Sequence, residues 1–122
     1  MTVVCVDTNW FVLHGLQKKV KKILPDSTVY SCLSPQKALD FAKDYGCDVL
    51  ITETDFGGEK EEGIQLAYKM KELNPLVNII FATGGLSRDY AQQVIKIRYS
   101  GLLTKPIGIE ELTRELGNLR YT

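Results

Sequence analysis

The chain has 122 residues, of which 44% are hydrophobic and 25% charged, a composition typical of one folded domain. Basic and acidic residues number 15 each, so the net charge is zero and gives no electrostatic footprint for nucleic acid in this segment. No apolar run approaches the roughly 18 residues of a membrane span. No basic region precedes the first apolar stretch, which excludes a signal peptide. We therefore expect a cytoplasmic domain that contacts no membrane.

Short apolar runs alternate with amphipathic stretches five times along the chain. We expect strands at Thr2–Val6, Thr28–Cys32, Asp48–Thr52, Asn78–Thr83 and Gly101–Thr104. Two of these runs, Val-Leu-Ile and Ile-Ile-Phe-Ala, are continuously apolar, which is typical of parallel strands covered on both faces.

The intervening stretches predict helices. In the first, apolar residues recur at helical spacing, and a lysine cluster is expected to face solvent: Lys18, Lys19, Lys21 and Lys22. The second begins at the cap Ser34 with Pro35 and stops at Gly46. The third is expected over about Ile64–Leu73, and the fifth over Ile109–Leu119. The fourth is expected from near Ser87, with Ala91, Val94 and Ile95 facing inward.

Five consecutive strand–helix units predict a three-layer α/β fold with a doubly wound parallel sheet and right-handed crossovers. In such sheets ligands bind beyond the carboxyl ends of the strands. The sequence contains neither a dinucleotide-binding Gly-x-Gly-x-x-Gly nor a phosphate-binding Gly-x-x-x-x-Gly-Lys-Ser/Thr loop. The chain stops just after the last predicted helix, so we expect a single domain, 1–122, that is free-standing or belongs to a longer protein.

Polar residues follow four of the predicted strands. Asp7 and Thr8 follow the first strand, Glu53 the third, Thr83 ends the fourth, and Lys105 follows the fifth. Carboxylates hold hard metal ions, whereas a hydroxyl and an ammonium group bond phosphoryl oxygens. This set predicts a site for a phosphoryl group, with or without a divalent metal.

Other reactive residues have no pattern that predicts chemistry. Cys5, Cys32 and Cys47 are odd in number and lack metal-ligand spacing, so we expect buried, reduced thiols. His14 is the only histidine and has no partner nearby in sequence.

The ordered segments ending at Asp7, Glu53, Thr83-Gly84 and Lys105-Pro106 together resemble the receiver domain of bacterial two-component response regulators. The resemblance covers essentially the whole chain. It implies a CheY-like, flavodoxin-like fold with strand order 2-1-3-4-5, a cis peptide before Pro106, and a place at the N-terminus of a longer regulator.

The sequence departs from the receiver pattern at the metal and acceptor positions. The family has two adjacent Mg²⁺-binding acids after the first strand, where this chain has Asp7 and Thr8. The family's phosphate-accepting aspartate is matched by Glu53, and its aromatic switch residue by Leu102. The resemblance thus implies a metal site at Asp7, Glu53 and Asp55 with weakened Mg²⁺ binding, because one carboxylate is missing.

A second alignment places the acceptor at Asp55. Gly63 would then follow the acceptor by eight residues, the spacing usual in the family. A shift of two residues preserves strand parity, so periodicity does not decide between the two. The segment from Asp48 to Glu53 instead reproduces the family's strand length and favours Glu53.

Three functions follow from these readings. The first is a pseudo-receiver of a phosphorelay, not an enzyme, which controls an output such as transcription through protein–protein contacts. The second is an active, Mg²⁺-dependent phosphoacceptor that uses Asp55 or Glu53 and catalyses at most its own phosphorylation. The third is an unrelated small-molecule binder, against which the Thr83 and Lys105 pair argues. The resemblance implies a histidine kinase or other signalling protein as partner, and a possible homodimer through the fourth helix, fifth strand and fifth helix.

Overall fold

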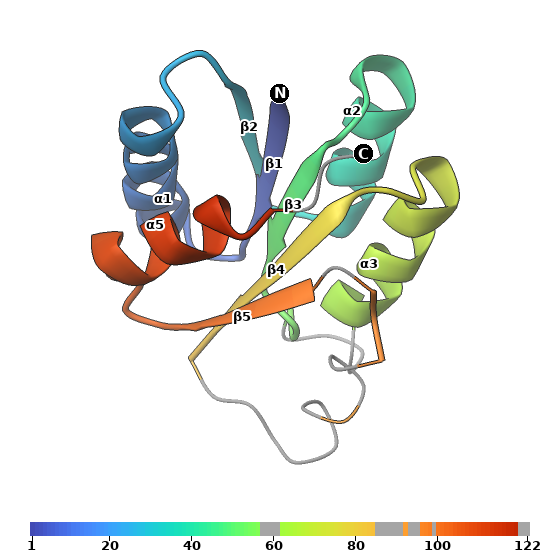
Figure 1. The fold of residues 1–122 in the computed structure, drawn as a ribbon. Coiled ribbons are helices and arrows are strands. Elements are labelled where there is room, and N and C mark those ends of the chain that lie inside the picture. Colours follow the sequence, from blue (N-terminus) through green and yellow to red (C-terminus); the bar gives the residue numbers. More distant parts are fainter. Residues whose placement is uncertain (57–61, 85–91, 93–95, 99, 120–122) are drawn as a thin grey trace.

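The computed structural model describes residues 1–56, 62–84, 92, 96–98 and 100–119. Five parallel strands form one sheet in the order β2-β1-β3-β4-β5 (Figure 1). Their bounds are β1 Thr2–Val6, β2 Thr28–Cys32, β3 Val49–Thr52, β4 Asn78–Thr83 and β5 Ser100–Thr104. The predicted α/β class, parallel sheet and strand order are confirmed.

Helices cover both faces of the sheet. The described helices are α1 Trp10–Ile23, α2 Pro35–Tyr45, α3 Glu62–Leu73 and α5 Ile109–Gly117. Helices α1 and α5 pack on one face, and α2 and α3 pack on the other (Figure 1). The predicted fourth helix, with Ser87, Ala91, Val94 and Ile95, lies outside the described residues.

The helix boundaries follow from local sequence signals. The side chain of Asn9 accepts hydrogen bonds from the first turn of α1, and Ser34 Oγ accepts one from Lys37 N at α2. Gly46 ends α2 with a φ of 80°, a left-handed conformation that favours glycine. Helix α3 begins two residues before the predicted start, and α5 ends two residues before the predicted end.

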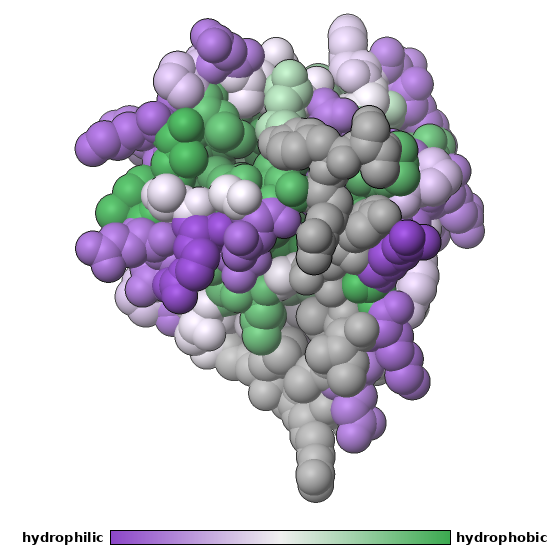
Figure 2. Space-filling model, viewed as in Figure 1, coloured by the Kyte–Doolittle hydropathy of each residue, from purple (hydrophilic) through white to green (hydrophobic). Residues whose placement is uncertain are grey.

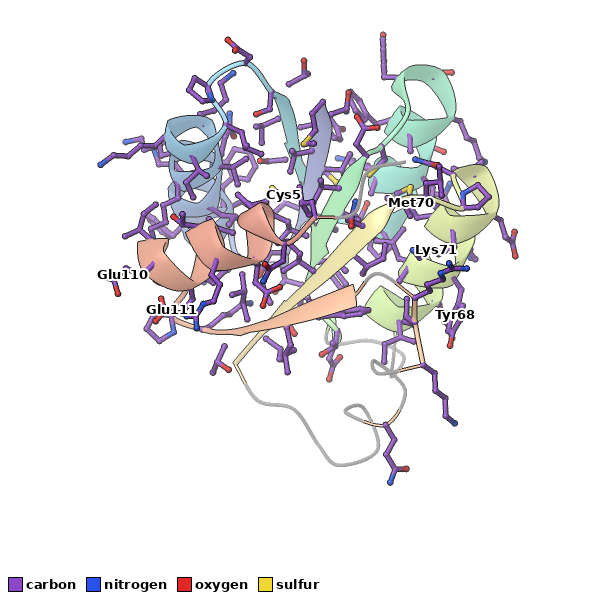
Figure 3. All side chains as sticks on the ribbon, in the orientation of Figure 1. Cys5, Tyr68, Met70, Lys71, Glu110 and Glu111 are labelled. Carbon is purple, nitrogen blue, oxygen red and sulfur yellow. The ribbon has the colours of Figure 1, made fainter. Side chains whose placement is uncertain are left out.

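The core is divided by the sheet into two apolar layers. Strands β3 and β4 are buried along their whole length, as their continuous apolar sequences predicted. Hydrophilic side chains gather over the outward sides of α5 and α3 (Figure 2). Figure 3 shows the same division in single residues: Glu110 and Glu111 of α5 are exposed, whereas Met70 of α3 is fully buried.

Two of the four clustered lysines do more than face solvent. Lys19 Nζ donates a hydrogen bond to the Ile107 carbonyl at 2.7 Å, and Lys21 Nζ donates one to the Ser27 carbonyl at 2.6 Å. These lysines tie α1 to the segments before α5 and β2. Lys18, Lys21 and Lys22 are exposed, as predicted for a solvated face, whereas Lys19 is half-buried.

The cysteine thiols lie in the core of the protein. All three cysteines are free and buried, as predicted, and burial raises the pKa of the Cys32 thiol to about 11 and that of Cys47 to about 12. His14 is exposed on α1. Among the described residues, no helix combines the length and the apolar character needed to cross a membrane.

The strand registers align the carboxyl ends that carry the polar residues. Val6 lies opposite Thr52, and the ladder continues because Glu53 N donates to the Val6 carbonyl at 3.1 Å. At the pair of strands β4 and β5, Lys105 N donates to the Thr83 carbonyl at 2.9 Å. The backbone thus fixes Asp7 beside Glu53 and Lys105 beside the end of β4 before any side chain contributes.

Helix α3 begins directly against this edge of the sheet. Gly63 N donates to the Thr54 carbonyl at 3.0 Å, and a Cβ at position 63 would overlap the backbone carbonyl of Glu53. Only glycine allows this approach without a shift of backbone.

Replacing Gly63 with alanine is expected to destabilise the protein by about 1–3 kcal/mol, the usual cost of overpacking. Urea denaturation measures the free energy of unfolding. Gly15→Ala in α1 is the matched control, because its Cβ would meet nothing within 4 Å. There alanine should stabilise the helix by about 0.5–1 kcal/mol. Equal effects of the two substitutions would contradict the close packing of Gly63 on Glu53.

Candidate functional site

The first side chain of the site is Asp7, which follows β1 and is only 3% exposed. Its backbone N–H donates to the Cys32 carbonyl at 3.3 Å, which continues the pairing with β2. Its Oδ1 accepts a hydrogen bond from Asn9 N at 2.9 Å. Asn9 in turn caps α1, so the turn after β1 holds the carboxylate in place.

Lys105 joins the acids that follow β1 and β3. Its Nζ lies 2.5 Å from Asp7 Oδ2 and 2.6 Å from Glu53 Oε2. The lysine side chain is 20% exposed, and Glu53 as a residue is 8% exposed. The peptide bond from Lys105 to Pro106 is cis, as the resemblance implied. One partly buried ammonium group therefore lies between two carboxylates.

The second oxygen of Glu53 is bonded by the next residue. Glu53 Oε1 accepts a hydrogen bond from Thr54 N at 2.8 Å and another from Thr54 Oγ1 at 3.2 Å. Thr54 Oγ1 also lies 3.5 Å from Thr83 Oγ1. Both carboxylate oxygens of Glu53 are thus held, one by Lys105 and one by Thr54.

These contacts shift the pKa values of both partners. Burial alone raises the pKa of Glu53, but hydrogen bonds from Lys105, Thr54 and Thr83, together with the Lys105 charge, lower it below its usual 4.5. Burial alone lowers the pKa of Lys105, but the hydrogen bonds and charges of Asp7 and Glu53 raise it above 10.5. The pair is therefore held in its charged form at neutral pH.

Three other residues named from the sequence are exposed. Thr8 and Asp55 are exposed, and Leu102 on β5 is 40% exposed. Of the two candidate acceptors, Glu53 contacts Lys105 directly, whereas Asp55 lies two residues further along the chain after β3.

The site fits a divalent metal ion poorly. Among the described residues, no group of three His, Cys, Asp or Glu side chains is placed to hold a metal, so the expected set of Asp7, Glu53 and Asp55 is not assembled. The reason is that the Lys105 ammonium occupies one oxygen of Asp7 and one of Glu53. The other oxygen of Asp7, Oδ1, accepts a hydrogen bond from Asn9 N, and Thr8 supplies no further carboxylate.

Sequence reasoning assigned no role to Thr54, which is only 1% exposed. The register of β3 with β4 explains its place in the site. Thr52 pairs with Phe81, so continuing the register by two residues places Thr54 level with Thr83. This register is a property of the folded sheet, and the strand pattern alone did not indicate it.

The stability of the protein should depend on pH in the manner that these pKa shifts dictate. Because the folded pKa of Glu53 is lowered, its contribution is present above about pH 4.5 and is lost as the pH falls through the folded value. Because the folded pKa of Lys105 is raised, its contribution is present below pH 10.5 and is lost as the pH rises through the folded value. Denaturation across this range should give a broad maximum between the two limits.

Replacing Lys105 with methionine is expected to reverse the direction in which the free energy of unfolding changes as the pH falls. Without the ammonium, burial next to Asp7 should raise the pKa of Glu53, so this variant should gain stability as the pH falls from 7 to 5. At pH 7 it should lose roughly 1–3 kcal/mol, between the values for exposed and buried pairs. Lys22→Met, on the exposed surface of α1, is the control and should leave the pH profile unchanged. A Lys105→Met profile parallel to wild type would contradict the assigned contacts.

Comparison with known proteins identifies the family of the chain and solved structures that share its fold. The sequence model of the response regulator receiver domain matches residues 3–117. A direct sequence search of curated proteins finds no match. The chain is 18% identical to the chemotaxis protein CheY4 of Vibrio cholerae, with a TM-score of 0.83 over 98% of both chains.

Two further solved structures have the same fold. One is a response regulator receiver protein from Sinorhizobium medicae, at 21% identity and a TM-score of 0.83, over 98% of this chain and 93% of that one. The other is the isolated receiver domain of RcsB from Salmonella enterica, at 24% identity and a TM-score of 0.83, over 98% and 87%. The sequence match extends over nearly the whole chain and the structures share its architecture, so the chain belongs to the response regulator receiver domain family.

Proposed function

We propose that this receiver signals through protein–protein contacts without phosphorylation, because Glu53 occupies the acceptor position and its carboxylate stands in for the phosphoryl group. The observation that supports this is the bonding of Glu53, whose two oxygens are taken by Lys105 and by Thr54. Lysine and hydroxyl groups are the partners that a phosphoryl group would use. The carboxylate therefore binds the lysine and hydroxyl groups without covalent modification of the protein.

The length of the side chain explains this reach. Glutamate carries its carboxylate one methylene further than aspartate, a displacement of about 1.5 Å along the side chain. That displacement brings Oε2 to 2.6 Å from the Lys105 ammonium. Phosphoryl transfer depends on positioning, and a misplacement of about 1 Å can reduce its rate on the order of a hundredfold.

The state of the carboxylate also disfavours attack on a phosphodonor. Both oxygens of Glu53 accept hydrogen bonds, and the Lys105 charge holds the group ionised and partnered. Receiver domains generally bind Mg²⁺ at this site, but here Thr8 replaces an acid and Lys105 competes for the remaining oxygens. We infer that Mg²⁺ binding is weakened.

Signalling output would use the exposed parts of β5 and α5. Leu102 on β5 is 40% exposed and Ile109 at the start of α5 is 39% exposed, so apolar side chains are available on this face. We infer that β5 and α5 bind a partner signalling protein or a second copy of the chain. The predicted fourth helix, which the resemblance assigns to the same surface, lies outside the described residues. From the neutral charge of the segment we infer that it makes no direct contact with DNA.

A second candidate is an active receiver with Asp55 as acceptor. Asp55 is exposed and thus accessible to a donor, and Gly63 follows it at the family's usual spacing. This candidate and the first predict different results with a phosphodonor.

Incubation with Mg²⁺ and a small acyl phosphate, followed by intact-mass measurement, should leave the wild-type protein unmodified. The double variant Thr8→Asp/Glu53→Asp should gain the mass of one phosphoryl group, because it restores the acid pair and the shorter acceptor. A wild-type adduct that is lost in Asp55→Asn but kept in Glu53→Gln would establish the second candidate. An adduct lost only in Glu53→Gln would make Glu53 a true acceptor and overturn the proposal.

A further inference from the structure

Thr54 is a buried polar residue that the receiver pattern does not account for. It follows Glu53 directly, is 1% exposed, and lies where α3 approaches the sheet through the hydrogen bond from Gly63 N. Its hydroxyl lies within hydrogen-bonding distance of two groups, the Glu53 carboxylate at 3.2 Å and the Thr83 hydroxyl at 3.5 Å. One side chain therefore connects the acid that follows β3 to the last residue of β4.

The direction of these hydrogen bonds follows from counting protons. A hydroxyl has one proton to donate, whereas an ionised carboxylate can only accept. The Thr54 hydroxyl therefore donates to Glu53 and presents its lone pairs to Thr83. Thr83 can then donate to Thr54 or directly to Glu53, and its hydroxyl does contribute to lowering the Glu53 pKa. In either case the Thr54 proton is donated to the negative charge of Glu53.

The same groups form a closed ring. Glu53 is bonded through Oε1 to Thr54, and Thr54 Oγ1 faces Thr83 Oγ1. The carbonyl of Thr83 accepts from Lys105 N at 2.9 Å, and Lys105 Nζ returns to Glu53 Oε2. Three strand ends are thus linked through four residues. The ring is closed through the covalent skeletons of Thr83 and Lys105, so each of its members limits the positions open to the others.

We infer that Thr54 is a positioning residue that couples the Glu53 carboxylate to Thr83, and so holds the end of β4 in one conformation. The inference rests on the proposed function in one respect: Glu53 takes the place of the phosphoryl group, and Thr54 transmits its presence. A carboxylate has fewer oxygens than a phosphoryl group, and here one of them bonds Lys105. Thr54 links the other oxygen to Thr83.

The test is the chemical shift of Thr83 in three variants of the isotopically labelled protein. Thr54→Val removes the hydroxyl and keeps the shape, and it should shift the Thr83 methyl and the Thr83 and Gly84 amide resonances. Thr54→Ser keeps the hydroxyl and should restore the wild-type positions. Thr52→Val is the matched control, because Thr52 is also fully buried but donates its hydroxyl to the Glu53 carbonyl at 2.9 Å.

Three results would overturn the inference: wild-type Thr83 resonances in Thr54→Val, equal shifts in Thr52→Val, or failure of Thr54→Ser to restore the resonances. If Thr54→Val does not fold, Thr83→Val gives the reciprocal measurement on the resonances of Thr54. Phosphorylation of the wild-type protein at Asp55 would defeat the proposed function while leaving these shifts measurable. The two claims can therefore fail separately.

Discussion

The ammonium group of Lys105 lies between the carboxylates of Asp7 and Glu53, and the arrangement of the polar side chains at the strand ends depends on this contact. Two acids brought together by parallel strands would repel each other in a partly buried site. One lysine, fixed by its backbone hydrogen bond to the Thr83 carbonyl, offsets that repulsion. The contact therefore helps to keep Glu53 ionised. It also leaves the second oxygen, Oε1, to accept the hydrogen bonds from Thr54.

The backbone of the sheet brings these residues together independently of their side-chain contacts. The registers of β1 with β3 and of β4 with β5 place Asp7 beside Glu53 and Lys105 beside Thr83. The close approach of Gly63 fixes the backbone of Glu53 from the other side. Because the backbone is set independently, the side chain at position 53 lies within reach of both Lys105 and Thr54.

Much of this was predictable from sequence, since continuous apolar runs define buried parallel strands and the carboxyl ends of such strands meet at one edge. That reasoning located Asp7, Glu53, Thr83 and Lys105. Periodicity alone did not decide between Glu53 and Asp55, because a shift of two residues leaves strand parity unchanged, and only the strand length favoured Glu53. It also gave no role to Thr54 and did not predict the hydrogen bonds of Lys19 and Lys21, because a side chain's choice among nearby acceptors depends on three-dimensional distances.

The central claim is that Glu53 is an ionised carboxylate held by Lys105, Thr54 and Thr83. Its most direct test is the pKa of Glu53 itself, measured from the pH dependence of the side-chain carboxyl ¹³C resonance in the wild-type protein. The account predicts a midpoint below the ordinary value of 4.5. A midpoint at or above 4.5 would show that burial outweighs the hydrogen bonds, and would contradict the assignment of Glu53 as a substitute for the phosphoryl group.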